Sequence, residues 1–216
     1  MPRFIAVANL KGGAGKSTIA VNLAGELAGK KHSVILVDAD AQGTATYWAS
    51  AGRLPFPVEA MPYETARDAK RWAPKVLEAD ADYVVIDCPP HVGGATEAAV
   101  GIADLVLIPV TASGADLAAT LKALDLVEQM RNARKDGGPA CIVVPSKIDT
   151  RTALGREIGE VLEQLGERVG PAVHQRVAFV ESFGQGLWIG DYEPNGPAYE
   201  DIEALGSAVR KALKKL

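Results

Sequence analysis

The amino-acid sequence predicts an α/β protein with an open, mostly parallel sheet that is flanked by helices on both faces. Short apolar runs rich in Val and Ile alternate with amphipathic segments along the chain, which is the pattern of repeated βα units. The runs are continuously apolar, as expected of strands buried on both faces. A glycine-rich loop follows the first run directly. The expected strands are residues 3–9, 33–40, 83–88, 105–110 and 140–146, with a weaker one at 168–174.

Two helices and one edge segment complete the expected framework. Residues 16–29 follow the glycine-rich loop, and residues 115–135 have a clear helical period that Gly137 and Gly138 bring to an end. The proline-containing residues 52–64 are expected to form a loop or an edge strand. The apolar stripe of the helix at 115–135 is expected to consist of Leu117, Leu121, Leu124 and Val127.

The composition is that of an ordinary globular protein. The 216 residues are enough for one well-cored domain, and we expect a single domain over residues 1–216. A net charge of −4 argues against a wholly basic nucleic-acid binder but leaves room for a local basic patch. Cys88 and Cys141 lie in apolar surroundings, so we expect reduced thiols in a cytoplasmic setting. We expect neither a secretory signal nor a transmembrane helix, which needs about 20 apolar residues.

The segment after the first expected strand has the pattern of a phosphate-binding loop. It reads Lys-Gly-Gly-Ala-Gly-Lys-Ser-Thr over residues 11–18. Glycines let backbone N–H groups surround phosphate oxygens, and the N-terminus of the following helix adds its positive end. Lys16 is expected to reach the β- and γ-phosphates, and the Ser17 hydroxyl to bind Mg²⁺. We therefore expect a P-loop NTPase fold whose nucleotide-binding residues are Lys11, Gly12, Gly13, Ala14, Gly15, Lys16, Ser17 and Thr18.

Two details distinguish this loop from the other common glycine-rich nucleotide-binding loops. Thr18 occupies the position where a dinucleotide-binding fingerprint needs its third glycine. Leu10 replaces the first glycine of the common phosphate loop, and a second lysine, Lys11, precedes the glycines. The alternative is a purely structural glycine-rich turn that starts a helix, but such a turn does not need Gly-Lys-Ser after a buried strand.

Acidic residues end two further expected strands. Asp38 and Asp40 are two residues apart, so an extended backbone points both side chains the same way. Asp87 ends the third strand, where nucleotide hydrolases hold a metal-binding or water-holding carboxylate. Ligands of open α/β sheets bind at the carboxyl ends of the strands. The alternative for each acid is simple solvation at the sheet edge.

These motifs resemble the ParA/MinD family of P-loop ATPases, whose loop reads K-G-G-x-G-K-[ST]. The segment DADAQG (38–43) is similar to the family's D-x-D-P-Q-G, and DYVVIDCPP (82–90) to its third-strand motif. The segments at 103–117 and 177–205 also resemble the family, so the resemblance covers nearly the whole chain. Ala41 departs from it, because the partition branch usually has proline there, and the loop after Asp40 could be looser.

The resemblance implies a role for the second lysine. A lysine at the position of Lys11 reaches across a dimer interface to the phosphates of the ATP bound by the partner. ATP sandwiched between two subunits then holds a homodimer together until hydrolysis. Asp40 is implied to position or activate the attacking water, and Ser17 to bind Mg²⁺ directly, with Asp38 and Asp87 acting through its waters. The implied catalytic residues are Lys11, Lys16 and Asp40, with ATP and Mg²⁺ as cofactors.

Three branches of the family differ in their partners. The membrane-positioning branch has an amphipathic tail, and the C-terminal segment here combines an apolar stripe with basic residues. A final helix packed on the sheet, with its lysines extended into solvent, explains the same pattern. The iron–sulfur carrier branch needs cysteines that face a metal together, and Cys88 and Cys141 do not form such a site. Because the loop starts by residue 11, the resemblance points to small partition ATPases without an N-terminal helix-turn-helix domain. The stripe consists of Tyr199, Ile202, Leu205, Val209 and Leu213.

The implied function is that of an ATP-dependent dimer that binds DNA without sequence preference and positions or partitions a cargo. A small adaptor protein on the cargo would stimulate hydrolysis, and the protein would be cytoplasmic and nucleoid-associated. The cargo could be a plasmid, a chromosome locus, a carboxysome-like compartment or a chemoreceptor cluster. DNA affinity should then fall steeply with salt. The candidate DNA-binding residues, each of which could also be a solvated charge, are Arg151, Arg156, Arg210, Lys211, Lys214 and Lys215.

A metabolic P-loop ATPase or GTPase that acts on a small substrate is the alternative from a different class. The segment PSKID (145–149) resembles the N-K-x-D element by which GTPases read guanine. Ser146 replaces the residue that carries the amide in that element, which favours ATP. The alternative predicts a monomer whose ATP hydrolysis is indifferent to DNA and adaptor.

Overall fold

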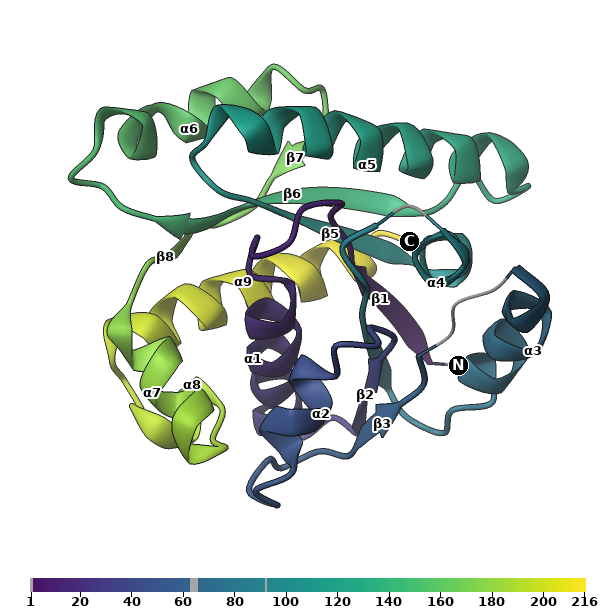
Figure 1. Cartoon of the computed structure of the whole chain (residues 1–216), viewed down its shortest axis with the longest axis horizontal. Coiled ribbons are helices and arrows are strands. Elements are labelled where there is room, and N and C mark those ends of the chain that lie inside the picture. Colours follow the sequence, from purple (N-terminus) through teal and green to yellow (C-terminus); the bar gives the residue numbers. More distant parts are fainter. Residues whose placement is uncertain (1, 63–65, 92) are drawn as a thin grey trace.

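The computed structural model describes residues 2–62, 66–91 and 93–216, and its centre is an eight-stranded sheet (Figure 1). The strand order is β3-β2-β4-β1-β5-β6-β7, and β8 pairs with β6. Every described pair of strands is parallel. This confirms the open parallel sheet expected from the apolar runs. The strands are β1 (Arg3–Val7), β2 (Val34–Asp38), β3 (Val58–Ala60), β4 (Tyr83–Asp87), β5 (Leu105–Val110), β6 (Ala140–Ile148), β7 (Arg168–Val169) and β8 (Val173–His174).

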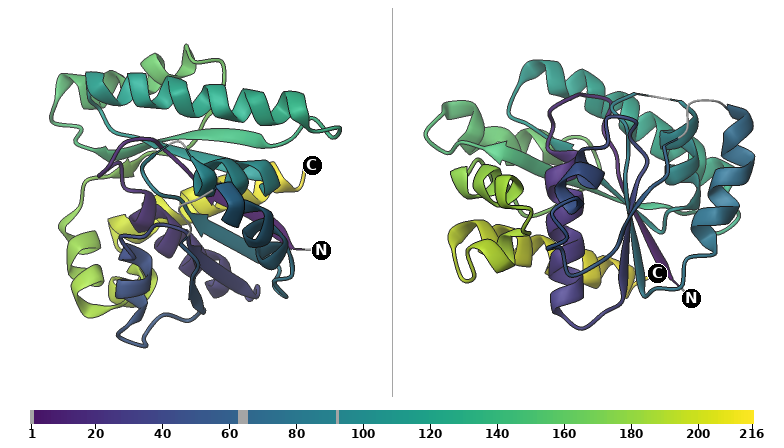
Figure 2. Two further views of the ribbon diagram at one scale, coloured as in Figure 1. Left: turned by 45° about the vertical axis from the view of Figure 1, so that its right-hand side comes forward. Right: turned by 60° about the horizontal axis from the view of Figure 1, so that its bottom comes forward.

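Helices cover both faces of the sheet, as the two turned views in Figure 2 show. One face carries α1 (Lys16–Gly29), α2 (Thr44–Ala49), α7 (Val177–Gln185), α8 (Ile189–Tyr192) and α9 (Pro197–Leu213). The other face carries α3 (Ala66–Leu77), α4 (Gly94–Ile102), α5 (Gly114–Ala133) and α6 (Ala153–Glu163).

Each central strand contributes to two separate apolar cores. In β1, Ile5 and Val7 pack under α1 and α9, whereas Phe4 and Ala6 pack under the helices of the opposite face. Successive side chains of a strand point to opposite faces. The strand is therefore apolar at every position that faces a core, which explains the continuous Val- and Ile-rich runs of the sequence.

The stripe expected on the long helix was wrong at one position. Leu121 is 48% exposed, whereas Thr120, Ala123 and Val127 of α5 are buried. These three follow the spacing i, i+3, i+7, so they form one face of the helix. Leu121 directly follows Thr120, so the winding of the helix carries its side chain away from that face. The helix ends at Ala133, before the two glycines that were expected to stop it.

Two other segments refine the expectations. The prolines of 52–64 accompany a short edge strand, β3, as expected, although residues 63–65 lie outside the described part of the chain. The weak strand at 168–174 is two short strands, β7 and β8, which both pair with β6.

The C-terminal helix packs as the sequence suggested. In α9 the stripe residues Ile202, Leu205 and Val209 are fully buried, and Tyr199 packs against the same core. The apolar stripe of this helix is thus inside the protein. Within residues 2–62, 66–91 and 93–216, no helix is both long and apolar enough to cross a bilayer.

Candidate nucleotide-binding site

The phosphate loop connects β1 to α1 at the carboxyl edge of the sheet. Gly13 and Gly15 have φ angles of 79° and 92°, in the left-handed region that favours glycine. A Cβ atom on Gly15 would lie 2.7 Å from Oγ of Ser146 in β6. The first turn of α1 has no acidic residue, and no side chain caps it. Its backbone N–H groups therefore remain available for an anion at the helix N-terminus.

Lys16 spans this loop from the inside. Its side chain is largely buried, at 7% exposure, and Nζ donates to the carbonyl oxygen of Lys11 at 3.1 Å. Burial lowers the pKa of Lys16, and the nearby Asp87 partly opposes that effect. An ammonium held across a ring of backbone N–H groups is what a phosphate loop needs to bind β- and γ-phosphates.

Asp87 is a completely buried carboxylate at the end of β4. Neither of its oxygens has a hydrogen-bond partner within the residues that the structure describes. Burial raises its pKa to about 7, while the neighbouring Ser17 hydroxyl and Lys16 act in the opposite direction. Such an orphaned carboxylate is costly without a ligand. The neighbouring strands β1 and β2 end level with Asp87, because Val7 and Asp38 are its partners in register.

Asp38 is also buried but is fully engaged. Its Oδ2 accepts from the backbone N–H and the hydroxyl of Thr46, both at 2.8 Å, and its Oδ1 accepts from the N–H of Asp40 at 3.2 Å. Asp38 therefore fixes the start of α2 and the loop that carries Asp40.

These residues fit a magnesium ion that is held mainly by a nucleotide. In the described residues, no cluster of three or more His, Cys, Asp or Glu could cage an ion by itself. Mg²⁺ usually keeps several waters and takes one or two carboxylates together with substrate phosphates. The unpartnered Asp87 beside the Ser17 hydroxyl meets that requirement, because water on the ion could satisfy its oxygens.

Asp40 lies half-buried at the mouth of this site. Its Oδ1 accepts from the N–H of Gln42 at 3.0 Å, and its carbonyl accepts from the N–H of Gly43 at 2.9 Å. These two bonds form a closed turn around Ala41. The turn is therefore defined without the proline that the family's partition branch usually has at this position.

Lys11 is half-buried and reaches another loop of its own chain. Its Nζ donates to Oγ of Ser113 at 3.1 Å, and its backbone N–H donates to Oδ1 of Asn9 at 3.3 Å. Ser113 precedes α5 and follows β5. The second lysine thus lies at the carboxyl edge of the sheet, where it contacts the loop that precedes α5.

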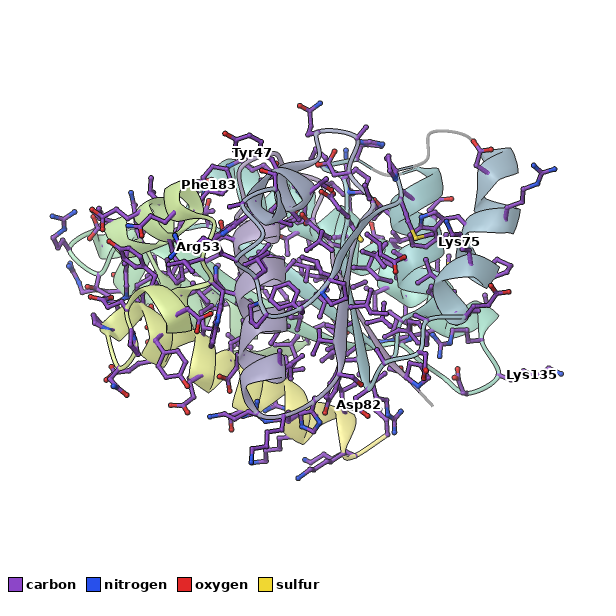
Figure 3. All side chains as sticks on the ribbon, turned by 90° about the horizontal axis from the view of Figure 1, so that it is seen from below. Tyr47, Arg53, Lys75, Asp82, Lys135 and Phe183 are labelled. Carbon is purple, nitrogen blue, oxygen red and sulfur yellow. The ribbon has the colours of Figure 1, made fainter. Side chains whose placement is uncertain are left out.

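A cavity of about 350 Å³ opens beside the phosphate loop. The loop side contributes Gly15 and Thr18, and the opposite side is closed by α2 and α7. The rings of Trp48 and Phe183 meet edge to face at 5.0 Å, and those of Tyr47 and Phe183 lie 5.7 Å apart. Figure 3 shows Tyr47 and Phe183 next to each other, on the opposite side of the molecule from Lys75. The remaining lining residues include Ser146, Lys147, Val173, His174, Gln175, Arg176 and Phe179.

The six candidate DNA-binding residues do not form one surface. Arg151 and Arg156 lie after β6, at the carboxyl edge, whereas the other four end α9 at the amino edge. There the last residue, Leu216, shares a cavity wall with Arg3 and Ala140, which begin β1 and β6.

The candidates also differ in how their charges are used. Arg210 donates to the buried Glu26 at 3.0 Å, and Arg151 pairs with Asp149 at 2.7 Å. Arg156 donates to the carbonyl oxygens of Thr150 and Arg151. The three remaining candidates, Lys211, Lys214 and Lys215, are exposed.

Comparison with known proteins agrees with this geometry. A family model described as the CobQ/CobB/MinD/ParA nucleotide binding domain matches residues 5–189. The chain belongs to this family. The CobQ/CobB/MinD/ParA assignment confirms the resemblance found in the motifs, and it covers both the phosphate loop and the cavity beside it.

Two curated members of the CobQ/CobB/MinD/ParA family indicate the range of relatives. The chain is 36% identical to the maintenance of carboxysome distribution protein A of Gloeobacter kilaueensis over 188 residues, 84% of this chain and 78% of that protein. It is 34% identical to the protein ParA of Rhizobium radiobacter over 216 residues, 97% of this chain and 96% of that protein.

Solved structures of this family share the fold. A variant of Cyanothece McdA in complex with ATP has a TM-score of 0.75 at 20% identity and covers 99% of this chain and 96% of its own. MinD of Pyrococcus horikoshii with Mg-ADP has a TM-score of 0.74 at 20% identity and covers 98% of this chain and 97% of its own. These likenesses establish a shared architecture.

Sequence reasoning missed the wall of the cavity. Lys147 and His174 line it, yet neither belongs to a phosphate-loop motif. Lys147 has a φ of 53°, and the pairing of β6 with β8 shifts register at this point, which re-aims the side chains. The segment PSKID could have pointed to Lys147, because it resembles a base-reading element, but it carries no signal for His174.

Proposed function

We propose that this protein is an ATP-dependent dimerising ATPase that positions or partitions a cargo on DNA. The observation that carries the proposal is the pair of lysines at one phosphate loop. Lys16 is buried across its own loop, whereas Lys11 lies at the open carboxyl edge and donates to Ser113 of a neighbouring loop. A second cation at this edge suits phosphates that another subunit brings, as an arginine finger does.

The chain's own residues supply the parts of a hydrolysis site. Lys16 and the backbone N–H groups of residues 12–17 would hold the phosphates, and Ser17, Asp38 and Asp87 would hold the hydrated ion. When bound, Mg²⁺ neutralises charge on the phosphate oxygens. Asp40, fixed by its turn, would orient the attacking water. The cavity beside Gly15 and Thr18 has the size and apolar walls suited to the base and ribose.

The cargo and its adaptor are proposed from the relatives. One relative bears the name of a carboxysome distribution protein, and another is named a chromosome partitioning protein, from Myxococcus xanthus. MinD of Aquifex aeolicus has been solved as a complex with the cell division protein MinC. We propose that this chain likewise works with an adaptor protein on its cargo and associates with the nucleoid through non-specific DNA contacts.

The experiment follows the oligomeric state and DNA retention of one preparation with Mg²⁺ and either ADP or ATP. ATP should give a dimer that retains DNA, and ADP a monomer that does not. Asp40→Ala should hold the ATP-bound dimer on DNA by slowing hydrolysis, whereas Lys11→Ala should abolish dimer and retention.

Lys75→Ala is the matched control, because it removes an exposed lysine on α3, which packs on the opposite face of the sheet from α1. It should behave as the wild type. A protein that stays monomeric and ignores DNA in every nucleotide state would contradict the proposal. It would point instead to a metabolic ATPase, such as the cobyrinic acid a,c-diamide synthase of Mycobacterium smegmatis, whose structure is similar with a TM-score of 0.71.

A further inference from the structure

A histidine on the cavity wall is held in a fixed hydrogen-bonding arrangement by a buried carboxylate. Nδ1 of His174 lies 3.0 Å from Oδ1 of Asp201, and the backbone N–H of His174 donates to Oδ2 at 3.0 Å. Arg176 donates to both oxygens of the same carboxylate, at 2.8 and 3.1 Å. Burial opposes ionisation of Asp201, but the bonds from Arg176 and His174 outweigh it, so the pKa of this carboxyl lies below its usual value.

This arrangement decides which nitrogen of His174 carries the proton. A carboxylate only accepts hydrogen bonds, so Nδ1 must be the donor. In a neutral imidazole the lone pair then sits on Nε2. Nη2 of Arg176 also lies near Nδ1, at 3.5 Å, but it donates to Oδ1 of Asp201 at 3.1 Å, and that carboxylate is the nearer partner of Nδ1. In the described part of the chain, the hydrogen bonds of the His174 ring are made through Nδ1. Nε2 is left as an acceptor on a residue that lines this cavity and two neighbouring ones.

The segment that resembles the guanine-reading element does not bring its carboxylate to the wall of this cavity. Guanine is usually held through a carboxylate that accepts from its N1–H and its amino group. Asp149, the acid of the PSKID segment, binds Arg151 through both oxygens, at 2.8 Å from Nε and 2.7 Å from Nη2. Ser146 stands where the amide would be and is buried against Gly15. Asp149 lines a different cavity, so the wall beside the phosphate loop offers the acceptor of His174 instead.

We propose that His174 selects adenine over guanine by accepting a hydrogen bond from the N6 amino group at Nε2, with Asp201 and Arg176 as positioning residues. Guanine has a carbonyl oxygen in place of that amino group, so two acceptors would face each other. One mismatched hydrogen bond of this kind changes affinity by about tenfold to a hundredfold. The inference rests on the proposed function, because it requires the cavity to hold the base of a nucleotide whose phosphates bind the loop.

The test compares the affinities of the full chain for three nucleotides with Mg²⁺: ATP, GTP and purine riboside triphosphate, which lacks the amino group. The wild type should bind ATP at least about tenfold more tightly than the other two. His174→Asn can still donate to Asp201 but has no group at the position of Nε2, so it should bind all three alike. His174→Gln places an amide oxygen near that position and should restore part of the preference for ATP.

His32→Asn is the matched control, since His32 is a surface residue beside Asp82. It should keep the wild-type preference. The inference is overturned if His174→Asn weakens all three nucleotides by one factor, or if the wild type does not distinguish ATP from purine riboside triphosphate. A wild type that dimerises with ATP but binds the three nucleotides equally well would overturn this inference alone. Failure of the wild type to bind Mg-ATP would overturn both it and the proposed function.

Discussion

Gly15 of the phosphate loop is required for two independent physical reasons. Its φ of 92° strains any residue with a Cβ, and that Cβ would lie 2.7 Å from Oγ of Ser146. We expect Gly15→Ala to lower the free energy of unfolding of the nucleotide-free protein by about 1–3 kcal/mol. Urea unfolding followed by circular dichroism measures this change.

Gly12, in the same loop, provides the control. A Cβ on Gly12 would have no atom within 4 Å beyond its chain neighbours, and its φ lies outside the left-handed region. Gly12→Ala should therefore change the free energy of unfolding by less than about 0.5 kcal/mol. Equal losses in the two variants would contradict the proposed role of Gly15.

Asp201 makes the stability of the fold depend on pH. Its pKa is lowered in the folded state, so it contributes stability that is present above the ordinary value of 3.8 and is lost as the pH falls through the folded pKa. We expect Asp201→Asn to lower the free energy of unfolding by about 1–3 kcal/mol at pH 7. The difference from the wild type should shrink below pH 3.8.

Denaturant unfolding at a series of pH values tests this expectation. Asp80→Asn, at an exposed carboxylate, is the control and should leave the free energy of unfolding nearly unchanged at each pH. A deficit of Asp201→Asn that stays constant from neutral pH to well below the ordinary value of 3.8 would show that ionisation of Asp201 is not its source.

At the scale of elements, α5 distinguishes a buried leucine from an exposed one on the same helix. Leu126 is 5% exposed and packs in the core between α5 and the sheet, whereas Leu121 is 48% exposed. We expect Leu126→Ala to cost about 2–5 kcal/mol of the free energy of unfolding. Leu121→Ala should cost less than about 1 kcal/mol, because it leaves no cavity. Thermal unfolding of both variants decides between this face and the leucine stripe that the sequence suggested.

At the scale of the whole molecule, the sheet separates two groups of basic residues. Arg151 and Arg156 lie at the carboxyl edge and are engaged with Asp149 and with backbone carbonyls. The exposed lysines of the α9 tail lie at the amino edge. A dimer joined through the carboxyl edges would place the two tails at its outer ends. We therefore expect the tails, rather than the two arginines, to make the proposed DNA contacts.

Two sets of substitutions compare these groups directly. Replacing Lys211, Lys214 and Lys215 by Gln should weaken DNA binding in the ATP state and flatten its salt dependence. Each lost phosphate contact removes about 0.9 from the slope of log K against log salt. Arg151→Gln with Arg156→Gln should change that slope little. The opposite ranking in a salt titration would place the DNA contacts at the carboxyl edge.

Arg210 was grouped with the tail by sequence, but tertiary structure gives it a different partner. It bonds to Glu26 of α1, whose side chain is 1% exposed, and so links two helices that are far apart in the chain. Burial raises the pKa of Glu26, and Arg210 partly offsets that effect. A loss of DNA binding in an Arg210 variant would therefore have to be separated from a loss of folding.

Local sequence patterns were sufficient to predict the parallel sheet, the position of the phosphate loop and the acids that end β2 and β4. These follow from local rules, because strands buried on both faces must be apolar along their length and a phosphate loop needs small residues before a helix.

Which side chains share an environment depends instead on how distant segments of the chain pack together. Among the described residues, the tertiary structure leaves Asp87 without a hydrogen-bond partner, whereas Asp38 accepts from Thr46. It orients α5 so that Leu121 is exposed, and it places Asp201 in contact with Nδ1 of His174. Each outcome depends on how helices settle on the sheet and on contacts between separate segments. Those contacts set the hydrogen bonds and packing, which no local pattern of residues encodes.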